Sequence, residues 1–125
     1  MKNISLEQII QFHTKIVKAT GGSVGVRDHG MIESALRKAE ATLNGQELYE
    51  GTIRKISVIG YALIKNHGFI DGNKRIGVAT ILFLLRLNGL SIKYEQKELI
   101  ELGLKTAEGT IKEENIEQWI EEHRV

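Results

Sequence analysis

The sequence predicts an all-α fold: a compact single domain of about six helices around a central buried helix. Apolar residues recur at three- and four-residue spacing in successive stretches, glycines separate these stretches, and the chain contains no proline. The chain has 125 residues, of which 42% are hydrophobic, enough to bury a core within one domain spanning residues 1–125. Cysteine is absent, which excludes disulfide bonds and thiolate metal sites.

Charge and hydrophobic patterns give expectations about nucleic-acid binding, secretion and membrane insertion. Lysine and arginine total 17 against 16 acidic residues, so the net charge of +1 gives no global attraction to nucleic acid, and any anion site must be local. The first residues, Met1–Ser5, lead into an amphipathic segment instead of a secretory signal. The most apolar run, Ile76–Leu85, is far shorter than the ~20 residues of a membrane-spanning helix. We therefore expect a cytoplasmic protein that neither binds nucleic acid directly nor enters a membrane.

Two helices are predicted in the first third of the chain. Ser5–Gln8 has the pattern of a capping box, and a helical apolar stripe then continues to Gly21 and Gly22. After a flexible stretch, a second apolar stripe runs from Met31 to Leu43 and is closed by Asn44-Gly45, which we interpret as a C-terminal cap.

Four more helices follow. The third stripe begins at Ile53 and stops at Asn66, just before His67. The fourth helix opens around residues 71–73 and ends at Asn88-Gly89; it is apolar on nearly every face, which predicts a central position. Weak alternation of apolar residues predicts a short extended piece over 90–94. The apolar spacing that follows predicts helices over 98–107 and 113–123.

Residues 67–75, with the sequence HGFIDGNKR, are the strongest candidate site. They form a short loop that leads into the buried fourth helix. A helix N-terminus presents free backbone N–H groups and the positive end of the helix dipole, so the amides near Gly72, Asn73 and Lys74 suit phosphate oxygens. Gly72 has no side chain and lets a ligand approach the backbone closely.

Lys74 and Arg75 add two cations at this positive helix end, where the dipole repels them. A bound anion would resolve that conflict. Successive helical residues point about 100° apart, so the two side chains should reach different phosphates. Arg75 can bind bidentately, whereas Lys74 acts as a point charge.

Two interpretations stay open for each of the remaining polar residues. Asp71 can be the N-cap of the fourth helix; beside a polyphosphate it is also the natural oxygen ligand for Mg²⁺, and the two roles are compatible. His67 can cap the third helix, or it can accept a proton from a substrate hydroxyl, because histidine is mostly neutral at pH 7. Phe69 alternates with polar neighbours and should point into the core.

Three polar residues outside the loop also allow more than one interpretation. His13 lies on the apolar stripe of the first helix, which favours a satisfied structural histidine over a ligand. Arg27 and Asp28 favour a turn with a local ion pair over an arginine that reaches the cleft.

The pattern H-x-F-x-D-G-N-K-R closely resembles the signature of the Fic/Doc family, in the form carried by its death-on-curing (Doc) toxins. The resemblance covers nearly the whole chain, including residues 25–28, 32–36, 46–49 and 116–119. It implies the helical Fic fold and a toxin of a toxin–antitoxin module. Its partner would be an antitoxin whose C-terminal segment binds the toxin.

The resemblance also implies an enzyme that uses ATP and Mg²⁺. It gives the role of general base to His67, magnesium binding to Asp71, and phosphate binding to Asn73 and Arg75. Relatives that transfer AMP have glycine in place of Lys74, whereas Doc has lysine and delivers the γ-phosphate of ATP to a threonine of elongation factor Tu. The resemblance thus implies a protein kinase that halts translation.

Two other functions and one regulatory pattern remain open. The same site can transfer AMP or another nucleotidyl group, or the chain can be a non-enzymatic binding protein whose loop holds a partner's phosphate or carboxylate. Gly68 stands where many relatives have proline. Residues 110–115 match the pattern [ST]-x-x-x-E-[GN] of an inhibitory helix in other Fic enzymes, although the apolar residues that follow explain that helix as part of the core.

Overall fold

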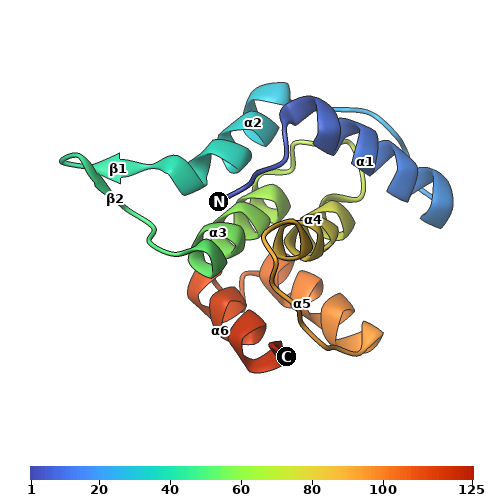
Figure 1. Ribbon diagram of the computed structural model, residues 1–125. Coiled ribbons are helices and arrows are strands. Elements are labelled where there is room, and N and C mark those ends of the chain that lie inside the picture. Colours follow the sequence, from blue (N-terminus) through green and yellow to red (C-terminus); the bar gives the residue numbers. More distant parts are fainter.

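The protein, described here by a computed structural model of residues 1–125, is built almost entirely of helices (Figure 1). The elements are α1 Leu6–Thr20, α2 His29–Arg37, the 3₁₀ turn η1 Lys38–Glu40, β1 Thr42–Leu43, β2 Gln46–Glu47, α3 Thr52–Asn66, α4 Asn73–Leu87, α5 Gln96–Glu108 and α6 Glu113–His123. The predicted all-α fold of about six helices is confirmed.

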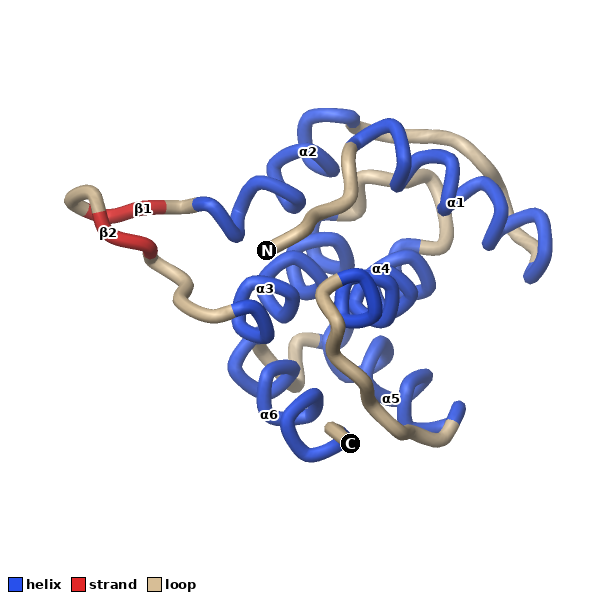
Figure 2. The backbone as a smooth tube through the Cα atoms, viewed as in Figure 1, coloured by secondary structure: helices blue, strands red, loops and turns tan.

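Helices α3 and α4 form the centre of the molecule. In Figure 2, α1 and α2 lie on one side of this pair, and α5 and α6 lie on the other. Helix α3 packs against all of α2, α4, α5 and α6. The two central helices approach closely at two glycines: a Cβ at Gly60 would collide with Ile81, and one at Gly77 would lie 2.9 Å from Cδ1 of Ile64. The absence of side chains at these two positions therefore sets how near α4 lies to α3.

Helix α4 is central, as predicted, but it is not covered on every side. Its core face is fully buried through Ile76, Ile81 and Leu84. On the opposite side Leu82 is half-buried and Phe83 is 38% exposed. This accessible side of α4 borders α1 and α5 and begins next to the candidate site.

The prediction that the second helix runs to Leu43 was wrong. Helix α2 ends at Arg37, and after the η1 turn the chain forms an antiparallel hairpin in which Leu43 pairs with Gln46. Asn44 and Gly45 both adopt left-handed backbone conformations, with φ of 54° and 79°. Such residues form two-residue hairpin turns. Leu43 continues the helical spacing, but its side chain is 64% exposed and joins no core.

The other predicted boundaries are close to the observed ones. The C-terminal residues lie beside the segment that follows α4. The extended piece predicted after α4 pairs with the C-terminus: Ile92 and Arg124 form a single antiparallel bridge, the Lys93 N–H donates to the His123 carbonyl at 2.8 Å, and the Val125 N–H donates to Ser91 at 3.1 Å. Helix α5 begins two residues earlier than predicted. None of the helices has the length and hydrophobicity that crossing a membrane requires.

Candidate active site

The candidate site is the loop between α3 and α4, which begins and ends with left-handed residues. His67 follows the last turn of α3 with φ of 49°, and Gly72 precedes the first turn of α4 with φ of 75°. The backbone of His67 therefore occupies the C-cap position, as one interpretation predicted, while the residue as a whole remains exposed. Phe69 is 1% exposed and anchors the loop in the core, which confirms its predicted direction.

The side chain of Asn73 fixes the loop from within. Its amide nitrogen donates to the Phe69 carbonyl at 3.0 Å, and its amide oxygen accepts from the Phe69 N–H at 3.0 Å. Both ends of the carboxamide are thus engaged by one residue four positions earlier. For the predicted binding of phosphate, Asn73 has its backbone N–H at the start of α4 and the second N–H of its carboxamide.

Arg27 supports the loop where it leaves α3. Its Nε donates to the His67 carbonyl at 2.6 Å, and a terminal nitrogen donates to the Asn66 carbonyl at 3.2 Å. The favoured interpretation of a local ion pair between Arg27 and Asp28 was wrong, because the Asp28 carboxylate instead accepts from the N–H of Met31 and caps α2. Carbonyl groups at a helix C-terminus lack partners within the helix, so they attract this guanidinium.

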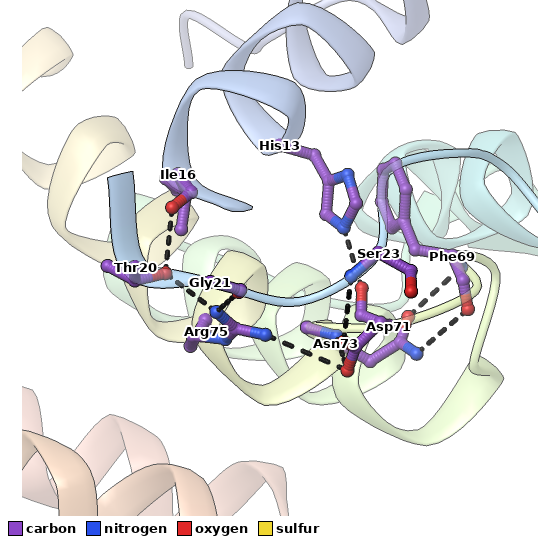
Figure 3. A network of polar contacts seen from close by, with 10 residues as sticks. His13, Ile16, Thr20, Gly21, Ser23, Phe69, Asp71, Asn73 and Arg75 are labelled. Carbon is purple, nitrogen blue, oxygen red and sulfur yellow. Dashed lines mark hydrogen bonds and ion pairs between the residues drawn. The ribbon is translucent and has the colours of Figure 1, made fainter. Parts of the chain in front are cut away.

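Asp71 is held as an ionised carboxylate at the entrance to α4 (Figure 3). One carboxylate oxygen accepts from the Ser23 N–H at 3.1 Å; the other accepts from the Gly72 N–H at 2.8 Å and lies 3.7 Å from the Arg75 guanidinium. The hydrogen bonds from Ser23 and Gly72, followed by the charge of Arg75, hold the pKa of Asp71 below its usual 3.8. The side chain is 45% exposed, so the charged group can be reached from solvent.

The interpretation of Asp71 as an N-cap was wrong. The cap position of α4 belongs to Gly72, and the Asp71 carboxylate bonds to Gly72 and to a distant segment instead of to amides inside the helix. The alternative role in metal binding fits the chemistry of the group. Each carboxylate oxygen accepts from one N–H and keeps a further lone pair, and Mg²⁺ commonly takes one or two carboxylates together with phosphate oxygens and water.

The two cations that follow diverge, as predicted. One terminal nitrogen of Arg75 donates to the hydroxyl of Thr20 at 2.6 Å and to the Gly21 carbonyl at 2.5 Å, so the guanidinium lies against the end of α1. Lys74 is exposed and starts next to α5: a Cβ added at Gly103 of α5 would lie 3.8 Å from the Cβ of Lys74. Arg75 and Lys74 therefore flank the start of α4 on different sides.

The segment after α1, residues 21–25, crosses directly over Asp71 and Arg75. Gly22 adopts φ of 112°, and a Cβ there would lie 2.9 Å from the Arg75 guanidinium and collide with the Asp71 carboxylate. The Gly25 carbonyl accepts from the Ile70 N–H at 3.1 Å, which joins this segment to the loop edge to edge. Sequence reasoning missed Thr20 and Ser23, since its only signal there was the Gly21-Gly22 pair, interpreted as the end of a helix.

His13 contacts the site from α1. The residue is 1% exposed, its ring stacks on Phe69 with centroids 3.9 Å apart, and its Nε2 lies 2.6 Å from the Asp71 carbonyl oxygen. Because a carbonyl only accepts, Nε2 must carry the proton and donate. The prediction of a satisfied structural histidine is confirmed, and its hydrogen-bond partner is a residue of the candidate site.

Comparison with known proteins identifies the family. The model of the Fic/DOC family matches residues 3–85, which include the whole loop and most of α4. The chain belongs to the Fic/Doc family. It is 34% identical over 74 residues to the Toxin Doc of Mycolicibacterium smegmatis, an alignment that covers 59% of this chain and 57% of that protein. It is 29% identical over 111 residues to the Protein kinase doc of Escherichia phage P1, covering 89% of this chain and 86% of that one.

The helix pattern associated with inhibition in other Fic proteins lies away from the loop in this Fic/Doc chain. Glu114, the acidic residue of the pattern, lines a small pocket with Tyr49 and Arg54, next to the N-terminal half of α3. The site loop follows the C-terminal end of the same helix. The structure therefore gives no support to self-inhibition through Glu114.

Proposed function

We propose that this chain is a Doc-type toxin with protein kinase activity. It would transfer the γ-phosphate of ATP to a serine or threonine hydroxyl of a translation factor, elongation factor Tu, and so arrest translation. One observation carries the proposal: an ionised, accessible Asp71 stands at the positive end of α4 beside Arg75, and Lys74 adds a second cation on another side of the same helix end. The similarity to the relative named Protein kinase doc supports the kinase reading.

The start of α4 would bind the polyphosphate of ATP. The N–H groups of Asn73 and the next residues point out of the helix end, and Gly72 offers no side chain to block the approach. Arg75 can bind one phosphate bidentately and Lys74 can neutralise another from the opposite side. Asp71 would hold Mg²⁺, which supplies neutralisation of charge between the phosphates when it is bound.

His67 would act as the general base. The oxygen of the target hydroxyl forms a bond to the γ-phosphorus, the bond from that phosphorus to the bridging oxygen breaks, and ADP leaves. The hydroxyl proton passes to a ring nitrogen of His67, whose exposed position at the mouth of the loop suits a protein substrate. The backbone of His67 is fixed by Arg27, so the ring pivots on a rigid support.

Lys74 is the residue that favours phosphate transfer over AMP transfer, on the basis of family resemblance. The test is incubation of the protein with Mg²⁺ and elongation factor Tu together with ATP labelled at either the α- or the γ-phosphate. We expect label on the factor from γ-labelled ATP only. Label from α-labelled ATP alone would establish AMP transfer instead, and growth arrest that persists unchanged in His67→Ala would favour a non-enzymatic binding protein.

We also propose a binding surface for an antitoxin. A pocket of about 430 Å³ extends along the accessible side of α4, and Lys74 and Arg75 line it at one end. Its apolar lining comes from α1, α4, α5 and the segment before α5, through Ile16, Val78, Ala79, Leu82, Tyr94, Leu99, Ile100 and Leu104. An amphipathic C-terminal segment with an acidic residue facing the two cations would fit this pocket.

The antitoxin proposal has a direct test. Ile100 and Leu104 are 61% and 44% exposed, so Ile100→Asp and Leu104→Asp should fold normally. We expect both variants to lose capture of the antitoxin encoded beside this gene and to stay toxic in its presence. Capture that equals wild type would place the antitoxin elsewhere.

For the chain as a whole, we propose a cytoplasmic protein in which residues 1–125 act as one domain.

A further inference from the structure

We propose that His13 is a positioning residue that holds Asp71 in the geometry required for metal–nucleotide binding. This inference rests on the proposed function, in which Asp71 binds Mg²⁺ beside the nucleotide. It concerns a buried titratable side chain on α1, 58 residues away in sequence from its partner and outside the family motif.

The first step is the hydrogen bond itself. The Asp71 carbonyl accepts from Nε2 of His13 at 2.6 Å, and no other side chain donates to that carbonyl. The ring cannot turn away, because it stacks on Phe69 with an angle of 14° between the planes and the residue is 1% exposed. His13 therefore presents its N–H to the loop from a rigid, buried position.

The second step is the effect on the carboxylate. Asp71 is held from two sides: its backbone carbonyl by His13 and its side chain by the N–H of Ser23. The peptide group that carries this carbonyl also carries the Gly72 N–H, which donates to the Asp71 carboxylate. Fixing the peptide plane thus fixes both the direction of the carboxylate and the first amide at the mouth of α4.

The role can be separated from simple packing by two substitutions at one position. His13→Phe keeps the stacked ring and loses the donor. His13→Gln loses the ring but places an amide N–H at a similar reach. If His13 positions Asp71, the N–H donor is the essential group. The glutamine variant should then retain more Mg²⁺-dependent ATP binding than the phenylalanine variant. His29→Gln is the matched control, because His29 is exposed and its ring is in none of the side-chain hydrogen bonds of the site.

Two measurements test the proposal. The first is the solvent-exchange rate of the Ser23 and Gly72 amides by NMR, without any ligand. The second is the Mg²⁺ concentration at half-saturation for ATP binding, with ATP binding in chelator as reference. In His13→Phe we expect faster exchange of both amides and about a tenfold higher Mg²⁺ requirement. His13→Gln should lie within about threefold of wild type in the Mg²⁺ titration.

The outcomes separate this inference from the proposed function. Unchanged amide exchange and an unchanged Mg²⁺ midpoint in folded His13→Phe, even with lower thermal stability, would show that His13 only packs. Equal loss in both variants would likewise overturn a role for the donor. If the wild-type protein fails to bind ATP with Mg²⁺ while exchange still responds to His13→Phe, then the proposed function is wrong and the positioning of Asp71 stands.

Discussion

The carboxamide of Asn73 and the backbone of Phe69 form a closed pair of hydrogen bonds, both 3.0 Å long, across the turn that enters α4. This pair makes Asn73 a structural brace of the loop. Asn73→Ala should lower the free energy of unfolding by about 1–3 kcal/mol, because two buried backbone groups lose their partners. Urea denaturation measures this cost. A residue that served only as a phosphate ligand would leave the stability of the free protein unchanged.

Arg27 should matter for catalysis without touching the nucleotide. Arg27→Ala leaves the Asn66 and His67 carbonyls without their side-chain donor, so His67, the proposed general base, loses its support. We expect a lower kcat for phosphate transfer with little change in the KM for ATP. Arg37→Ala is the matched control, since Arg37 is 73% exposed and pairs only with Glu33 one turn away. Equal effects of the two substitutions would contradict the assignment.

Gly77 should tolerate no side chain. A Cβ there lies 2.9 Å from Cδ1 of Ile64, so Gly77→Ala should cost about 1–3 kcal/mol through overpacking at the crossing of α3 and α4. The double variant with Ile64→Ala should cost less than the sum of the two single variants. Gly30→Ala, at an exposed position of α2 where a Cβ would lie 3.3 Å from Oδ1 of Asp28, should cost less than Gly77→Ala, because it meets one side-chain atom at the surface and not the packed core. Thermal unfolding of the four variants decides the point.

The contact between His123, at the end of α6, and Glu98 should make a pH-dependent contribution to the free energy of unfolding. Nε2 of His123 lies 2.9 Å from the Glu98 carboxylate; this hydrogen bond raises the pKa of His123 above its usual 6.5 and lowers that of Glu98 below its usual 4.5. The histidine contribution is complete below pH 6.5 and is lost as pH rises through the raised pKa. The glutamate contribution is complete above pH 4.5 and is lost as pH falls through the lowered pKa.

The pair is therefore most effective between these two values. We expect the difference in melting temperature between wild type and His123→Gln to be larger near pH 5.5 than near pH 9. The stacking of His123 on Trp119 is lost in the variant at every pH, so it shifts both differences equally. His29→Gln controls for loss of a histidine. A difference that is the same at the two pH values would contradict the assignment.

The helical pattern was predictable because most helices carry a local signal. The capping box at Ser5, the stop at Asn66 and the apolar run of α4 are all properties of neighbouring residues, and each boundary was placed within two residues. The end of α2 was not, because Asn44-Gly45 is compatible with both a helix cap and a hairpin turn. Only the exposure of Leu43 separates the two, and exposure depends on the rest of the fold.

The motif residues were also predictable, whereas the groups that hold them were not. His67, Asp71 and Arg75 share one continuous segment, so the sequence displays them together. Their supports come from residues 40 to 55 positions away: Arg27 holds His67, Ser23 holds Asp71, and Thr20 holds Arg75. Backbone donors such as the Ser23 N–H leave no trace in residue type, which is why sequence reasoning interpreted this stretch as flexible.

These long-range supports make the integrity of the site separable from that of the core. Helix α1 fully buries two apolar side chains, Ile9 and Val17, and packs others against the core only partly buried, whereas most of the fully buried apolar side chains come from the other helices, chiefly α3 and α4. Detachment of α1 therefore costs less free energy than global unfolding. A molecule with α1 detached would keep its central helices and the complete motif, yet Asp71 and Arg75 would lose their anchors. Partial unfolding that begins at α1 would thus remove the supports of the site while the core persists.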